Sequence, residues 1–181
     1  MVISRYHIEG VFSFVPSVFT DERGAFMETF NQKIIDEAAG RHLEFVQDNQ
    51  SISKKNVVRG LHFQIPPFAQ AKLVRVLKGK VIDVAVDLRK HSSTYGQHVS
   101  IELSAENNTV FFIPEGFAHG FSVLEENTVF AYKCSAFYSK QHEGSILWND
   151  QALNINWKIE NPVVSDKDKI GPLLHDFNSP F

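Results

Sequence analysis

The stretch KLVRVLKGKVIDVAVDLR, residues 72–89, indicates the fold class of the chain. Two runs rich in valine, leucine and isoleucine, residues 73–77 and 81–88, lie on either side of Gly79, which is the pattern of a β-hairpin. In the second run an apolar face alternates with a face that carries Asp83 and Asp87. We therefore predict an antiparallel hairpin whose two carboxylates lie on a solvated face.

Short runs of the same kind fill the chain from about residue 45 to residue 157. Valine, isoleucine, phenylalanine and tyrosine dominate them, and turn signals separate them at residues 54–56, 66–67, 78–80, 106–108, 114–116 and 125–127. Such spacing is typical of an antiparallel sandwich or barrel. An all-β fold is the prediction.

Helical signals are few. Residues 31–41 carry apolar residues at helical spacing, with Asn31 as N-cap and Gly40 as stop. A second short turn is predicted to begin at Ser165, because residues 165–168 fit a capping box. We expect one domain over residues 1–181, in which the N-terminal strands and the C-terminal helical segment pack on the central barrel.

Composition narrows the class of protein. The 181 residues are 43% hydrophobic and 22% charged, which is typical of a globular domain. A net charge of -3 gives no broad basic field, so charge suggests neither a nucleic-acid nor a membrane partner. The single cysteine, Cys134, excludes an internal disulfide and is expected to be a small core residue. No signal-peptide pattern opens the chain, so we expect a cytoplasmic protein.

The stretch FFIPEGFAHGFSVL, residues 111–124, places one histidine after a tight turn. Its P-x-G-x-x-H pattern is the second half of the cupin signature. His119 shares a strand face with Phe121 and Val123, and a histidine on such an apolar face is most often a hydrogen-bonded core residue. The pattern predicts a cupin-like barrel.

Metal-binding cupins also carry an H-x-H pair in the first half of the signature. Here RGLHFQ, residues 59–64, supplies His62 alone, with Gln64 where the second histidine would stand. One histidine from each half leaves too few ligands for the usual site with three protein ligands. The sequence therefore predicts a barrel that works without a metal or other cofactor.

Proton transfer at a carbon beside a carbonyl would use the residues that remain. It needs a base, a cation or donor for the enolate oxygen, and an acid. His62 can be the base, because imidazole titrates near pH ~6.5. Lys72 can supply the cation, and Tyr132 can be the acid. Taken singly, each also fits an ordinary structural or surface role, and spacing alone leaves both readings open.

Longer motifs give a family resemblance. They are DERGAFMETF, QDNQS, VVRGLHFQIPPFAQAKLVRVLKGKVIDVAVDLRKHSSTYG, IPEGFAHGF, AYK and EGSILWND, and together they span nearly the whole chain. With them the chain resembles the dTDP-4-dehydrorhamnose 3,5-epimerases, isomerases of dTDP-rhamnose biosynthesis. The resemblance implies a jelly-roll homodimer that acts on a dTDP-linked 4-keto-6-deoxyhexose, in which N-terminal strands of one subunit complete the site of the other.

The resemblance also implies roles for single residues. His62 resembles the general base, and Asp168 the carboxylate that orients it. Tyr132 resembles the acid on the opposite face of the sugar ring, and Lys72 the cation that holds the 4-keto oxygen. Arg23 and Arg59 match diphosphate ligands. Further matches to residues that contact the substrate are Phe26, Glu28, Gln47, Asn49, His119, Tyr138, Glu143 and Lys167.

Three alternatives stay open. A single-carbon epimerase on a related nucleotide sugar would share the histidine, lysine and tyrosine. A non-catalytic nucleotide-sugar-binding barrel is disfavoured because base, acid, cation and orienting carboxylate are all present. A metal-dependent cupin oxygenase is disfavoured by the missing H-x-H pair.

One geometric conflict remains in RGLHFQ. Strict strand alternation places Arg59 and His62 on opposite faces, although both are expected to reach one cavity. A β-bulge would resolve the conflict, and glycine is the residue that permits one. We predict an irregularity near Gly60.

Overall fold

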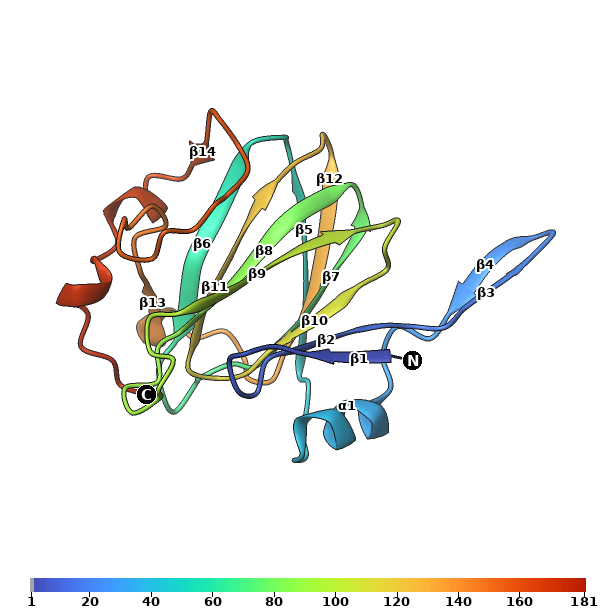
Figure 1. The fold of residues 1–181 in the computed structure, drawn as a ribbon, viewed down its shortest axis with the longest axis horizontal. Helices are drawn as coiled ribbons and strands as arrows, with labels where there is room; N and C mark the ends of the chain where they lie inside the picture. The colour runs from blue at the N-terminus through green and yellow to red at the C-terminus, as the bar shows by residue number, and fades with distance from the viewer. Residues whose placement is uncertain (1) are drawn as a thin grey trace.

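A computed structural model describes residues 2–181 as two six-stranded sheets packed face to face (Figure 1). The first sheet contains, in order, β1 (Val2–Arg5), β2 (Phe12–Val15), β10 (Val110–Ile113), β7 (Lys72–Lys78), β12 (Thr128–Cys134) and β5 (Gln47–Ser53). The second contains β13 (Glu143–Ser145), β6 (Val57–Gln64), β11 (Phe117–Val123), β8 (Lys80–Asp87) and β9 (His98–Ser104), with β14 (Val163–Val164) parallel to β6. All other pairs are antiparallel, so the prediction of an all-β sandwich or barrel is confirmed.

The helical elements are short. Helix α1 (Gln32–Ala39) begins after Asn31, whose side chain accepts a hydrogen bond from the Lys33 backbone N–H, and ends at Gly40 with a φ of 69°. The helix expected over residues 31–41 is therefore confirmed. Three single turns follow: η1 (Lys140–His142), η2 (Asp168–Ile170) and η3 (Leu174–Asp176). Within residues 2–181, no helix is both long and apolar enough to cross a membrane.

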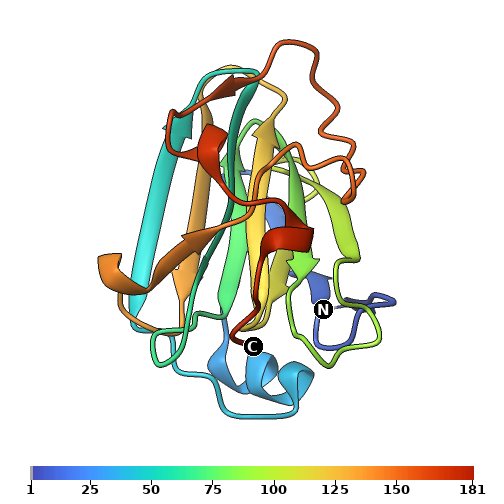
Figure 2. The same cartoon turned by 90° about the vertical axis from the view of Figure 1, so that its left-hand side faces the viewer.

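Two segments lie outside the sheets. β3 (Val18–Asp21) and β4 (Gly24–Met27) form a hairpin that projects from the body of the molecule (Figure 1). The C-terminal segment crosses the outer face of the second sheet (Figure 2), where Phe177 and Phe181 pack on the ring of Phe63. It thus covers the outer face of β6, the strand that carries His62.

The expected hairpin around Gly79 is wrong. β7 pairs with β10 and β12 in the first sheet, whereas β8 pairs with β9 and β11 in the second. Gly79 has a φ of 81°, and a Cβ there would lie 2.3 Å from Thr128 Oγ1. The turn therefore carries the chain from one sheet to the other. Two apolar runs around a glycine have the same sequence pattern whether they form a hairpin or join two sheets. The pattern does not distinguish them because the strands that pair with each run are distant in the sequence.

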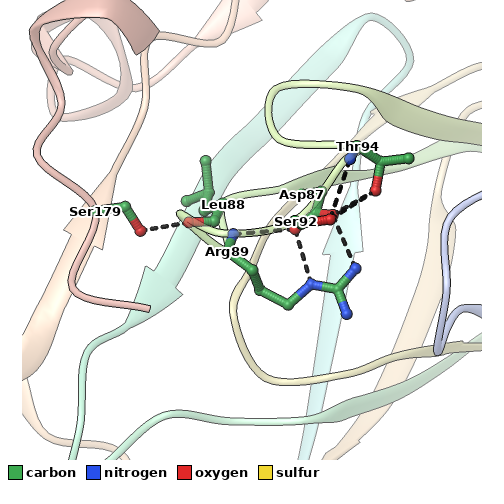
Figure 3. A network of polar contacts seen from close by, with 6 residues as sticks. All are labelled: Asp87, Leu88, Arg89, Ser92, Thr94 and Ser179. Carbon is green, nitrogen blue, oxygen red and sulfur yellow. Dashed lines mark hydrogen bonds and ion pairs between the residues drawn. The ribbon is translucent and has the colours of Figure 1, made fainter.

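The solvated face expected for Asp83 and Asp87 is also wrong, because both residues are fully buried. β8 lies between β9 and β11 and is covered on both faces, which its alternation did not reveal. Asp87 binds the Arg89 guanidinium and the hydroxyls of Ser92 and Thr94 (Figure 3). Burial alone would raise the pKa of Asp87, but these hydrogen bonds lower it to about 2.

The predicted irregularity near Gly60 is confirmed. His62 pairs with His119 and Arg59 with Phe121, so Gly60 and Leu61 together oppose Gly120. Gly60 has a φ of 131°, and a Cβ on it would lie 2.5 Å from the Gly120 Cα. Both glycines are therefore needed for this close approach of two strands. The extra residue returns Arg59 and His62 to the same cavity.

Candidate active site

A cavity of about 460 Å³ lies between the two sheets. β6 and β11 of the second sheet bring His62 and His119 to its wall, while β7 and β12 of the first sheet bring Lys72 and Tyr132. Asp168 reaches it from η2. The structure thus gathers the four predicted catalytic residues, which are up to 106 positions apart in the chain, around one space.

His62 and Asp168 form a hydrogen-bonded pair. Nε2 of His62 lies 2.6 Å from Asp168 Oδ1, and the other carboxylate oxygen accepts a hydrogen bond of 3.3 Å from the Gly60 backbone N–H. Burial acts to raise the pKa of Asp168, but the hydrogen bond and charge of His62, together with hydrogen bonds from Gly60 and Ser165, lower it. An ionised carboxylate holds the hydrogen on Nε2, so Nδ1 is the nitrogen free to accept a proton.

The turn expected at Ser165 positions this carboxylate. The backbone N–H of Asp168 donates to the Ser165 carbonyl at 3.0 Å and to its hydroxyl at 3.2 Å. The Asp168 side chain is thereby left free for His62. Ser165 therefore caps the turn through its hydroxyl, and the Asp168 carboxylate bonds to His62 and to the Gly60 backbone.

Lys72 is buried beside His62. The residue is 9% exposed, and Nζ lies 3.5 Å from the His62 carbonyl oxygen. Burial lowers the pKa of Lys72, while the charges of nearby acidic groups, Asp83 among them, oppose that effect. A buried ammonium group with unused hydrogens is suited to an oxygen on which negative charge develops.

His119 is paired with Asp83, which the sequence pattern had placed on a solvated face. Nε2 of His119 lies 3.0 and 3.1 Å from the two carboxylate oxygens of Asp83, and both residues are buried. His119 is therefore a hydrogen-bonded core residue, as its apolar face suggested, and it also lines the cavity. The available signal was in β8, where the neighbours of Asp83 on its own face, Val81 and Ala85, are apolar.

Tyr132 shares the cavity with His62 but comes from the other sheet. It lines the same cavity from β12, where it pairs with Asn49 and Val74. Burial raises the pKa of its phenol, so the hydroxyl keeps its proton at neutral pH. A proton acceptor and a proton donor thus lie on opposite sides of one space.

A second cavity, of about 300 Å³, adjoins the first and shares His62, Lys72 and Tyr132 with it. Gln47 accepts a hydrogen bond of 2.9 Å from the Tyr138 backbone N–H, and the Tyr138 hydroxyl donates to Glu143 at 3.0 Å. Lys167 pairs with the other oxygen of Glu143 at 2.5 Å. Asn49 and the buried Cys134 complete this polar wall.

A sequence model of one protein family, dTDP-4-dehydrorhamnose 3,5-epimerase, matches residues 5–176. The chain belongs to this family. It is 56% identical over 176 residues to the dTDP-4-dehydrorhamnose 3,5-epimerase of Shigella flexneri, with 97% of each chain covered. The crystal structure of the Elizabethkingia anophelis NUHP1 enzyme gives a TM-score of 0.93 at 48% identity, over 97% of both chains. The Legionella pneumophila Philadelphia 1 enzyme, in complex with dTDP-4-keto-L-rhamnose, gives 0.94 at 45% identity, over 98% of this chain and 94% of that one.

Membership of this epimerase family confirms the expected isomerase activity and the cupin-like jelly-roll fold. The remaining predicted residues of the epimerase divide into two groups. Arg59 lies at the first cavity, where its Nε donates to Ser53 Oγ at 3.1 Å. Arg23, Phe26 and Glu28 line neither cavity that contains His62.

Those three residues of the epimerase lie on or just after the projecting hairpin. Arg23 pairs with Asp21 at 2.5 Å, and Phe26 is 71% exposed. Glu28 accepts a hydrogen bond from the Asn31 side chain. A single chain therefore does not bring these three residues to either cavity lined by His62.

Proposed function

We propose that this epimerase inverts carbons 3 and 5 of dTDP-4-dehydro-6-deoxy-D-glucose to give dTDP-4-dehydro-L-rhamnose, and that it does so in the cytoplasm. One observation supports the mechanism most directly: His62 and Tyr132 reach a single cavity from opposing sheets. Inversion needs this arrangement, because a lone base would return the proton to the face it left. The family match and the complex of the Legionella enzyme support the substrate.

Each inversion is then two proton transfers. Nδ1 of His62 takes the proton from the carbon beside the keto group, and the electron pair of that C–H bond forms an enolate. The charge on the enolate oxygen is stabilised by the Lys72 ammonium group, with His119 as a further polar contact. Tyr132 then donates its phenolic proton to the opposite face of the carbon. Exchange with solvent restores both groups, and the second carbon follows by the same steps.

In this proposal the nucleotide lies in the second cavity and contacts its polar wall. Tyr138 presents an exposed ring for the thymine or the sugar, while Gln47, Asn49 and Glu143 offer hydrogen bonds. Arg59 and Lys167 lie at the first cavity, where their charges suit the diphosphate.

Solvent isotope labelling tests the reaction. After chelator treatment, the protein is incubated with dTDP-4-dehydro-6-deoxy-D-glucose in deuterated water, and the sugar is analysed by NMR. We expect deuterium at both carbon 3 and carbon 5, in the inverted product. Label at one carbon would show a single-carbon epimerase, and no label would show a binding protein. Loss of exchange with chelator would show a metal-dependent reaction.

The projecting hairpin is proposed to act in a homodimer, where it carries Arg23, Phe26 and Glu28 into the site of the second subunit. Phe19 and Phe26 on this hairpin are 65% and 71% exposed, as expected for a segment that a second chain covers. Arg23 could then reach the substrate diphosphate, which it cannot approach within its own chain.

Mixing two inactive variants tests this arrangement. Arg23→Ala removes the arginine side chain of the hairpin, and His62→Ala removes the imidazole of the base. A mixed dimer nevertheless retains one site in which both residues are intact. We expect an equimolar, refolded mixture to recover about one quarter of the unsubstituted activity, because half the dimers are mixed and each has one intact site. Light scattering measures the mass of the species. A monomer, or a mixture no more active than its parts, would contradict the proposal.

A further inference from the structure

Gln64 stands at the position where metal-binding cupins carry a second histidine, and its side chain has a different use here. It is 4% exposed at the end of β6. Its Nε2 donates to the Phe68 carbonyl at 2.7 Å and to the Phe137 carbonyl at 3.1 Å. Its Oε1 accepts from the Ser139 backbone N–H at 2.7 Å. Both amide hydrogens and the amide oxygen are therefore engaged by backbone groups.

These contacts join two loops that lie far apart in the sequence, residues 65–71 and residues 135–139. Other bonds between them lie nearer the strands: Gln70 donates to the Ala136 carbonyl at 2.7 Å, and Ala71 and Ser135 exchange bonds of 2.8 and 3.0 Å. Gln64 binds the part of the second loop that lies farther from the strands, from Phe137 to Ser139.

The residue between those two contacts is Tyr138. The residue is 56% exposed, yet its backbone N–H donates to the Gln47 side chain and its hydroxyl donates to Glu143, so it is held at both ends. We propose that Gln64 is a positioning residue for nucleotide binding, which holds the loop at residues 137–139 so that Tyr138 presents its ring to the base. This inference rests on the proposed place of the nucleotide at Tyr138.

An amide is required for this role. The carbonyls of Phe68 and Phe137 each accept a hydrogen from the buried Gln64 amide, and removing those donors at residue 64 is costly. Methionine has a similar length but supplies no donor and only a weak sulfur acceptor. Glutamate in its ionised form would place a negative oxygen against two carbonyls. The protonated acid would restore one of the two donors.

The test measures dTDP binding by calorimetry, together with kcat and KM. For Gln64→Met we expect dTDP affinity to fall about tenfold and KM to rise to match, with kcat changed less than about threefold, because the base and acid are untouched. For Gln64→Glu we expect weaker binding than in the unsubstituted protein at pH ~7.5 and a partial recovery at pH ~5.5, where a buried carboxyl regains its proton.

Ser122→Ala is the matched control. Ser122 is also fully buried and donates one hydrogen bond, to the Trp157 carbonyl at 2.6 Å, but it lies away from both loops. Its loss is expected to lower the melting temperature and leave dTDP affinity unchanged. If Gln64→Met and Gln64→Glu bind dTDP as Ser122→Ala does, the positioning role is refuted. If Tyr138→Ala also binds dTDP normally, the proposed nucleotide site itself is wrong; weakened binding in Tyr138→Ala alone refutes only the role of Gln64.

Discussion

Replacing His62 by alanine is expected to abolish deuterium exchange at both carbons of the sugar. Alanine leaves the cavity without the nitrogen that removes the proton, while Asp168 keeps its hydrogen bond from Gly60 and its place in the turn at Ser165. Loss of a general base costs roughly 10²–10⁴-fold in rate, so we expect kcat to fall by about 10³-fold or more. Because the hydrogen bonds that hold Tyr138 come from Gln47 and Glu143 rather than from His62, dTDP should still bind.

The measurement is the exchange rate by NMR, with dTDP affinity by calorimetry on the same samples. His42→Ala provides the control, because His42 is exposed and also pairs with a carboxylate, that of Asp36, at 2.7 Å. Full exchange in His62→Ala would show that another group is the base. A loss of dTDP binding as large as the loss of rate would show that the substitution damaged the site as a whole.

Local sequence signals predicted the elements better than their partners. The helix at residues 32–39 was predictable because its cap, its spacing and its stop are all within ten positions. The bulge at Gly60 followed from a conflict between alternation and the need for Arg59 and His62 to share a cavity. In contrast, the run around Gly79 predicts two strands but not which sheet each joins, since that depends on β10, β12, β9 and β11.

Burial was the second property that the sequence did not predict correctly. Alternation in β8 indicated a polar face, but that face is closed by the opposite sheet, and its carboxylates are stabilised by partners from other segments. Asp83 therefore looked like a surface residue although it holds His119. The signal that points inward is the scarcity of other polar residues in the strand.

The four predicted catalytic residues show the same difference between what the local sequence indicates and what depends on distant segments. His62, Lys72 and Tyr132 could be proposed from the needs of enolate chemistry, because each stands in an apolar strand where an ionisable group is costly. Asp168 lies 106 positions from His62, and only the resemblance to known epimerases suggested the pairing that the structure shows. Gln64 was informative as a missing histidine, but its three backbone contacts depend on loops that sequence alone does not place.

Replacing Tyr132 by phenylalanine is expected to separate proton removal from inversion. The ring still fills the cavity and keeps its contact with Phe130, but the hydroxyl that donates the proton is gone. His62, on the opposing sheet, still removes the proton and exchanges it with solvent. The deuteron can then return only from the side of His62, so the recovered sugar should carry deuterium with its original configuration.

The experiment follows deuterium and configuration at carbons 3 and 5 in one NMR sample. We expect exchange within about tenfold of the unsubstituted rate and inversion slowed by roughly 10²-fold or more, the usual loss for a catalytic acid. Tyr95→Phe is a suitable control, since Tyr95 lies outside both cavities that contain His62. Equal losses of exchange and inversion would place Tyr132 in the first proton transfer. Normal inversion would mean that the second proton comes from another group, and that two opposing sheets are not what sets the stereochemistry.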